Sequence, residues 1–169
     1  MTYDILLSEA DIAARIDSMA REMAPRLTED TVGVCLLTGG IWFAADLTRA
    51  LARHGLGIGF DSMWLSSYGD GRQSGEMILR ADLQRPVTGK QVLIMDDVLD
   101  TGASLKFARD HLLRAGATEV LTAVMASKPV ERQIEADYVG WEAPKRYLVG
   151  YGLDDGGRLR GLPFIGALD

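Results

Sequence analysis

The sequence predicts an α/β protein with a parallel sheet flanked by helices. Short apolar, β-branched runs, which are typical of buried strands, alternate along the chain with longer segments of helical periodicity. Glycine-bearing turns follow two of these runs. Strands that alternate with helices form a parallel sheet covered by helices on both faces. We expect one domain over residues 1–169, because a chain of this length can bury one full core.

The first part of the chain predicts a helix, a strand and a second helix. Residues 8–24 form the first helix in this reading, because Ser8 and Asp11 make a capping pattern and apolar residues recur on one face. The run TVGVCLL, residues 31–37, predicts a buried strand. A Thr-Gly-Gly turn follows it, and then a helical pattern that closes at Gly55.

The second part of the chain predicts a hairpin and a further strand, helix and strand. Residues 60–83 indicate two strands joined by a polar, glycine-rich loop from about 66 to 75. Residues 91–96 predict the next strand, 103–116 a helix and 118–126 another strand.

Composition excludes several classes of protein. The net charge of −6 argues against a nucleic-acid-binding face, which normally needs a basic stripe. The single Cys35 lies in an apolar run, so we expect a buried thiol in a reducing compartment. The chain has neither a signal-peptide pattern at its start nor an apolar stretch of the ~18 residues that a spanning helix needs. We therefore expect a cytoplasmic protein that binds neither membranes nor nucleic acid.

The stretch VLIMDDVLDTGASL, residues 92–105, predicts a binding site for a sugar phosphate. Its strand ends in the acid pair Asp96 and Asp97, and the turn 100–104 leads into a helix. Backbone N–H groups at such a helix start attract a phosphate, and ionised carboxylates accept from sugar hydroxyls or bind Mg²⁺. Ligands collect at the carboxyl ends of parallel strands, so the Thr-Gly-Gly turn should lie at the same edge of the sheet.

Residues 93–105 resemble the phosphoribosyl-pyrophosphate (PRPP) motif of the type I phosphoribosyltransferases. More narrowly, the chain is similar to the hypoxanthine-guanine phosphoribosyltransferases in LLTGGIWFAADL, SSYGDGRQSGE, IMDDVLDTGASL, ADYVGWEAP, YLVGYGLD and RGLPFIGAL. This resemblance implies a lid hairpin over residues 66–75 and a small hood formed by the termini. It also implies transfer of 5-phosphoribosyl from PRPP to a 6-oxopurine with release of pyrophosphate, dependence on Mg²⁺, and a homodimer or homotetramer.

The resemblance also implies a role for individual residues. Asp100 would be the general base near the purine N7. The 5′-phosphate and ribose would be held by the acid pair and the turn that follows it, Asp96, Asp97, Asp100, Thr101, Gly102, Ala103 and Ser104. Pyrophosphate would be bound by Thr38, Gly39, Gly40, Ser67, Tyr68 and Arg160. The metal would be held by Asp154, Asp96 and Asp97. The purine would be bound by Lys128, Tyr147 and Leu148.

Chemistry favours the role of Lys128, because an ammonium has only donors and therefore selects a carbonyl oxygen at purine position 6 over the amino group of adenine. Four points stay open. Thr38 stands where many relatives have Lys, and Asp96 stands where the family usually has Glu. Asp155 and Arg158 are neighbours that compete with Asp154 and Arg160 for their roles. A xanthine-preferring enzyme and a PRPP-binding regulator of nucleic acid are the alternative functions.

Overall fold

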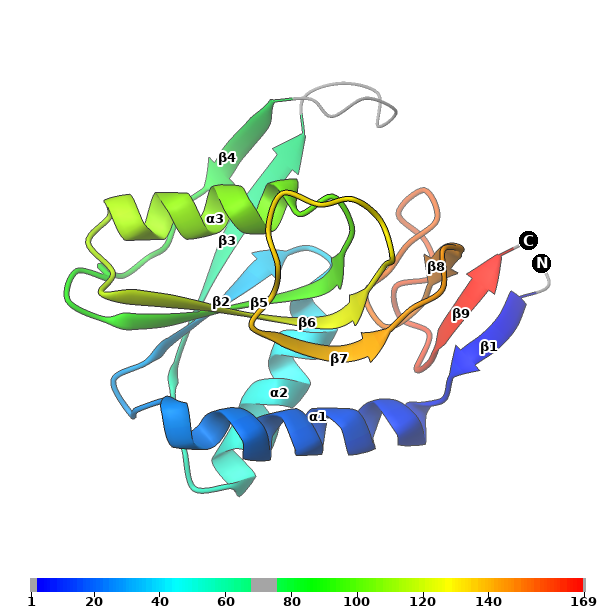
Figure 1. Cartoon of the computed structure of the whole chain (residues 1–169), viewed down its shortest axis with the longest axis horizontal. Helices are drawn as coiled ribbons and strands as arrows, with labels where there is room; N and C mark the ends of the chain where they lie inside the picture. Colours follow the sequence, from blue (N-terminus) through cyan, green and yellow to red (C-terminus); the bar gives the residue numbers. More distant parts are fainter. Residues whose placement is uncertain (1–2, 68–75, 169) are drawn as a thin grey trace.

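A computed structural model describes residues 3–67 and 76–168 of the chain. Its centre is a six-stranded sheet in the order β4-β3-β2-β5-β6-β7 (Figure 1). The strands are β2 (Val32–Leu37), β3 (Gly59–Ser67), β4 (Met77–Ala81), β5 (Gln91–Leu99), β6 (Glu119–Ser127) and β7 (Tyr138–Glu142). All neighbouring pairs are parallel except β3 and β4, which form an antiparallel hairpin at one edge. The predicted fold class is confirmed.

Helices cover both faces of this sheet. Helices α1 (Glu9–Met23) and α2 (Ile41–Arg53) lie on one face, and α3 (Ala103–Arg114) lies on the other (Figure 1). A short 3₁₀ turn, Ala24–Arg26, follows α1. The capping pattern predicted at the start of α1 is present, because the Ser8 hydroxyl accepts from the Asp11 amide at 3.2 Å and the Asp11 carboxylate accepts from the Ser8 amide.

Two apolar clusters hold the layers together. One lies between the sheet and α1 with α2, and includes the fully buried Phe43, Leu47 and Met125. The other lies between the sheet and α3, and includes Ile94 and Leu112. Burial of such side chains supplies most of the favourable free energy of folding. The strands that carry the candidate site are therefore anchored on both faces.

A second, three-stranded sheet joins the two ends of the described chain. Its order is β1-β9-β8, with β1 (Tyr3–Leu7), β8 (Tyr147–Val149) and β9 (Ile165–Leu168) all antiparallel. It lies beside one end of the central sheet (Figure 1). This is the small hood that the family resemblance predicts. Within the described residues, no helix is long and apolar enough to cross a membrane.

Candidate active site

The carboxyl ends of β2 and β5 bring the two predicted glycine turns together. Gly39 follows β2, and its Cα lies so close to Asp97 of β5 that a Cβ at position 39 would collide with the Asp97 carboxylate. A third segment joins them, because a Cβ on Gly152 would collide with the carbonyl oxygen of Gly39. The peptide bond from Leu37 to Thr38 is cis. The expectation that both turns share one edge of the sheet is confirmed.

Asp96 and Asp97 form a tightly coupled acid pair at the end of β5. Burial, reinforced by the neighbouring Asp97 carboxylate, raises the pKa of Asp96 well above its ordinary range. Burial also raises the pKa of Asp97, although the hydrogen bond from Asp96 and the nearby Arg160 guanidinium act in the opposite direction. A cation or a set of hydroxyl donors at this position would offset the cost of placing two charges in a partly buried site.

The acid pair also affects the pKa of Cys35 on β2. Burial, followed by the negative charges of Asp96 and Asp97, raises the pKa of the Cys35 thiol to about 12. The side chain is 1% exposed. The expectation of a buried thiol is therefore confirmed. The raised pKa disfavours the thiolate, which is the reactive form.

The turn between β5 and α3 has a backbone geometry that suits an anion. Gly102 takes the left-handed conformation, with φ of 77°, and α3 begins directly after it at Ala103. The amides at the start of α3 and the helix dipole face the same end of the helix. The segment that follows β6 in the chain stabilises the turn, because the Gln133 amide donates to the Thr101 carbonyl at 2.9 Å. Ile134 closes over Gly102, where a Cβ would find no room.

Lys128 lies directly across from Asp100, the first residue of this turn. Its Nζ is 3.3 Å from Asp100 Oδ2, and only 18% of the Lys128 side chain is exposed, against 50% for Asp100. The Lys128 amide donates to the Leu99 carbonyl at 3.0 Å, which fixes the start of the lysine segment to the end of β5. One cation and one carboxylate therefore lie side by side at the turn that leads into α3.

A segment with sharp turns, residues 150–163, carries the next charged pair. The Arg160 guanidinium lies 2.9 Å from Asp154 Oδ1 and donates to the Gly152 carbonyl at 2.5 Å. Asp154 Oδ2 accepts from the Gly157 amide at 2.6 Å. Arg158 is exposed and lies in the small turn that its backbone forms with Asp155. Of the two arginines, Arg160 is the one whose charge acts on Asp97 of the acid pair.

The aromatic residue predicted to bind the ring lies at the edge of the hood. Tyr147 is the first residue of β8, and 53% of its surface is exposed. Its hydroxyl donates to the Asp154 carbonyl at 3.2 Å, which links it to the charged segment. Leu148 is buried next to it and pairs with Ala167 in the hood sheet. The exposed face of Tyr147 is available for stacking on a planar ligand.

Three further residues, Thr38, Ser67 and Tyr68, were predicted to bind pyrophosphate. Thr38 is exposed and leaves the turn after β2 without a cation of its own. Ser67 is exposed at the end of β3, opposite Met77 of β4. Tyr68, and with it most of the expected lid loop, lies outside the described residues.

The carboxylates of the site suit a metal that arrives with its substrate. Among residues 3–67 and 76–168, no group of three or more His, Cys, Asp or Glu side chains is placed to hold a metal ion. Mg²⁺ is usually bound by one or two carboxylates together with substrate phosphates and water, and not by an all-protein cage. The partly buried acid pair and Asp154 supply oxygen donors of the required kind, so the residues present fit Mg²⁺.

Sequence reasoning missed three residues of the arrangement. Gly152 was not predicted to contact the turn 38–40, which is expected to bind pyrophosphate. Tyr151 and Asp46 were not predicted to form a hydrogen bond with each other. Tyr151 is 5% exposed and its hydroxyl donates to Asp46 on α2. An aromatic residue between two glycines, as in Gly-Tyr-Gly, is a signal that could have drawn attention to this segment.

Comparison with known proteins gives a consistent result. A family model described as "Phosphoribosyl transferase domain" matches residues 2–155. A hypoxanthine-guanine phosphoribosyltransferase of Aquifex aeolicus is 40% identical over 166 residues, which cover 95% of this chain and 92% of that protein. One from Staphylococcus epidermidis is 38% identical, with 98% of this chain and 93% of the relative covered.

Solved structures match the whole fold. A hypoxanthine phosphoribosyltransferase from Staphylococcus aureus superposes with a TM-score of 0.90 at 34% identity, covering 98% of this chain and 91% of the other. The Trypanosoma cruzi hypoxanthine phosphoribosyltransferase in complex with the product IMP gives a TM-score of 0.89 at 29% identity, with 98% and 93% covered.

Proposed function

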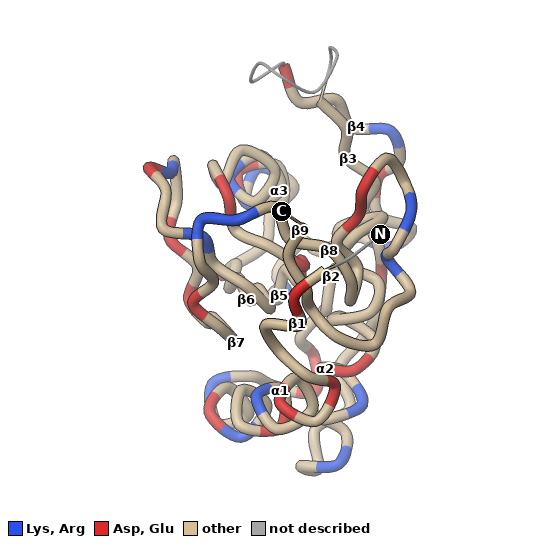
Figure 2. Tube along the Cα trace, turned by 90° about the vertical axis from the view of Figure 1, so that its right-hand side faces the viewer, with Lys and Arg blue, Asp and Glu red and all other residues tan. Residues whose placement is uncertain are grey.

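The chain belongs to the phosphoribosyltransferase family, and we propose that it is a purine-salvage enzyme. It transfers the 5-phosphoribosyl group of PRPP to hypoxanthine, and to guanine, giving IMP or GMP and pyrophosphate. Its relatives with this activity match nearly its full length. They do not favour a xanthine-preferring enzyme or a PRPP-binding regulator of nucleic acid. The charge distribution also disfavours a nucleic-acid regulator, because Lys and Arg are interspersed with Asp and Glu over the described part of the chain (Figure 2).

The observation that carries the proposal is the position of Lys128 opposite Asp100 above the anion-binding turn. A 6-oxopurine has a carbonyl oxygen and N7 on neighbouring atoms of one edge. The Lys128 ammonium donates to the carbonyl oxygen, and the Asp100 carboxylate takes the proton of N7 as the new bond to ribose forms. Adenine would present an amino group to an ammonium, which offers no acceptor.

The other residues bind and orient PRPP. Amides at the start of α3, with the hydroxyls of Thr101 and Ser104, hold the 5′-phosphate, and the acid pair accepts from the ribose hydroxyls. Arg160 and the turn at Gly39 bind the pyrophosphate. Tyr147 stacks on the purine. The transition state is oxocarbenium-like, so most of the rate enhancement comes from positioning and from stabilising the leaving group.

We propose Mg²⁺ as the cofactor, held by Asp154 and by the acid pair Asp96 and Asp97. When bound, Mg²⁺ supplies positive charge that offsets the charge of the pyrophosphate group. Position 38 holds Thr where many relatives have Lys, so the turn after β2 contributes a hydroxyl and backbone donors but no positive charge, which makes the charge of Mg²⁺ more important there. Arg160 is already held close to Asp154 and to Asp97.

We propose a single phosphoribosyltransferase domain over residues 1–169 that acts in the cytoplasm as a homodimer or homotetramer. Large apolar side chains exposed on one side of β3 support self-association, since Phe60 and Trp64 are each 49% exposed. They lie four residues apart on one strand and so share a face. The molecular mass in solution, measured by light scattering, tests this part of the proposal.

Turnover with four bases tests the function itself. Purified protein is given PRPP and Mg²⁺ with hypoxanthine, guanine, xanthine or adenine, and nucleotide formation is followed by absorbance. We expect turnover of hypoxanthine and guanine and little of adenine. Preference for xanthine would favour the related subfamily. Binding of PRPP without turnover of any base would favour a sensor.

A further inference from the structure

We infer that Tyr151 and Asp46 are positioning residues for pyrophosphate: the hydrogen bond between them holds the 150–163 segment against α2. This inference rests on the proposed function, because it concerns the leaving group of that reaction. Both residues lie within segments that resemble the family, LLTGGIWFAADL and YLVGYGLD, but the resemblance assigned a role to neither of them.

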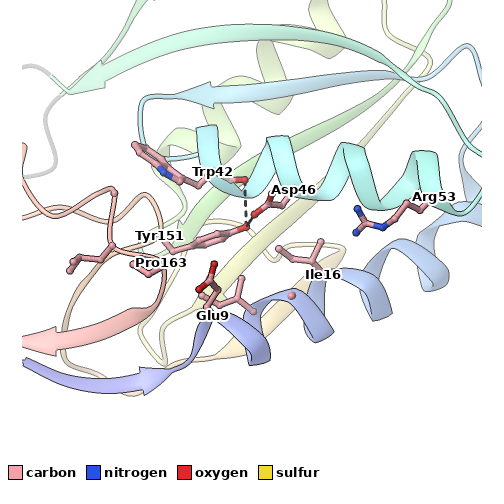
Figure 3. Close-up of a pocket in the computed structure, with 11 residues that line it drawn as sticks. Glu9, Ile16, Trp42, Asp46, Arg53, Tyr151 and Pro163 are labelled. Carbon is pink, nitrogen blue, oxygen red and sulfur yellow. Dashed lines mark hydrogen bonds between the residues drawn. The ribbon is translucent and has the colours of Figure 1, made fainter.

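The contact between the two side chains is short and well supported. The Tyr151 hydroxyl donates to Asp46 Oδ2 at 2.7 Å and lies 3.4 Å from the Trp42 carbonyl oxygen (Figure 3). The other carboxylate oxygen of Asp46 accepts from Arg49 at 2.6 Å. Both oxygens of Asp46 are thus engaged, so the carboxylate has one preferred orientation toward the tyrosine. Burial, followed by the hydrogen bond to Asp46, raises the pKa of Tyr151, which remains a donor.

Tyr151 lies in the middle of the charged segment. Its amide donates to the Leu162 carbonyl at 2.9 Å, and the next amide, of Gly152, donates to the Arg160 carbonyl at 2.9 Å. The Arg160 guanidinium in turn donates a hydrogen bond to the Gly152 carbonyl. The position of Arg160, and of Asp154 paired with it, therefore depends on where Tyr151 is held.

Asp46 lies on α2, the helix that follows the turn 38–40, which we call the pyrophosphate turn. Helix α2 begins at Ile41, directly after Gly39 and Gly40. The turn and the charged segment also meet at the backbone, where Gly152 lies against the Gly39 carbonyl. The Tyr151–Asp46 bond is a second connection between the same two elements, one and a half turns further along α2. Together the two contacts set the distance between the turn and Arg160.

Tyr151 belongs to the apolar cluster beside α1 and α2, but its packing is incomplete on one side. Tyr151 borders a cavity of about 380 Å³ between α1 and α2, together with Ile16 and Trp42 (Figure 3). Ile12 and Leu162 also line this cavity. An open cavity on one side means that the ring lacks contacts there. The hydrogen bond is therefore the directional restraint on this side of the segment.

The test compares Tyr151→Phe and Asp46→Ala, alone and together, with wild type. The readouts are the Kd for pyrophosphate with Mg²⁺, measured by calorimetry, and the KM values for PRPP and hypoxanthine. We expect each single variant to weaken pyrophosphate and PRPP binding about fivefold to tenfold, as the loss of one hydrogen bond implies. The KM for hypoxanthine should stay unchanged. The double variant should be no worse than either single one, because both remove the same bond.

Two controls separate positioning from general destabilisation. Asp46→Asn keeps an oxygen acceptor for the tyrosine and should bind pyrophosphate nearly as wild type does. Tyr138→Phe removes the hydroxyl of another buried tyrosine, which interacts with Arg26 far from the turn, and should leave pyrophosphate binding unchanged. Unchanged binding in Tyr151→Phe would overturn the inference. So would additive losses in the double variant, or an equal loss in Tyr138→Phe. Wild type that binds pyrophosphate but turns over no base would overturn the proposed function and leave the pyrophosphate comparison as a valid test.

Discussion

The ammonium nitrogen of Lys128 lies 3.3 Å from a carboxylate oxygen of Asp100, although 28 residues separate them in the chain. The two groups come from the ends of neighbouring parallel strands, β6 and β5, and Lys128 is additionally fixed by its backbone bond to Leu99. A purine that binds beside the two groups would offer its carbonyl oxygen to the Lys128 ammonium and an N–H to the Asp100 carboxylate. In the proposed function, this ion pair selects 6-oxopurines.

Replacing Asp100 with Asn should slow turnover strongly. The amide keeps the size of the side chain but cannot take a proton, so kcat should fall by about 10²- to 10⁴-fold, the usual contribution of a general base. The KM for PRPP should change little, because the backbone of the turn is retained. Steady-state kinetics with hypoxanthine checks this. Asp110→Asn on α3, which removes a carboxylate paired with Lys106, is the matched control. An unchanged kcat in Asp100→Asn would remove this residue from the role of base.

Replacing Lys128 with Met should reduce selection of the base. Methionine keeps the length of the side chain without a donor, and hydrogen bonds to charged groups contribute enough for a loss of about 10- to 100-fold in kcat/KM for hypoxanthine. The ratio of kcat/KM for hypoxanthine to that for adenine should fall as well. Competition assays with both bases measure this ratio. Lys90→Met, at a surface pair with Asp30, should leave it unchanged, and an unaltered ratio in Lys128→Met would contradict the assignment.

Replacing Gly39 with Ala should disturb the pyrophosphate turn. The added Cβ would collide with the Asp97 carboxylate, so either the turn or the acid pair must shift. A displacement of about 1 Å at a reacting centre can cost on the order of 100-fold in rate, and we expect a fall of that size in kcat/KM for PRPP. Gly57→Ala, at a position with open space around it, is the control, and thermal unfolding of both variants detects loss of folding. Full activity in Gly39→Ala would mean that this close approach is not required.

Local patterns predicted much of this arrangement, and long-range contacts account for what they missed. The Asp100–Ser104 turn and the capping of α1 depend on residues close in sequence, so their spacing indicates their structure. Strand β5 runs three residues beyond the predicted end at Asp96, because β6 continues to pair with it as far as Leu99. The Tyr151–Asp46 bond joins residues 105 apart. Such a pairing depends on how α2 and the 150–163 segment are brought together, which no local pattern encodes.

The two neighbouring arginines give the sharpest remaining prediction. Arg160 contacts the Gly152 carbonyl and Asp154, and its charge opposes the effect of burial, which raises the pKa of the partly buried Asp97. Arg158 is exposed on the outer turn of the same segment. Arg160→Ala should therefore raise the KM for PRPP and the inhibition constant of pyrophosphate by about 10- to 100-fold, the range expected for loss of a charge-assisted hydrogen bond.

Arg158→Ala removes the same side chain two residues away and is the matched control. It should leave both constants close to those of wild type, because solvent screens an exposed charge. Product inhibition by pyrophosphate at fixed Mg²⁺ measures the effect directly and does not depend on the purine. If Arg158→Ala had the larger effect, the pyrophosphate would have to lie outside the 150–163 segment, on the side away from Asp97. The close approach of Gly152 to Gly39 would then have no part in binding it.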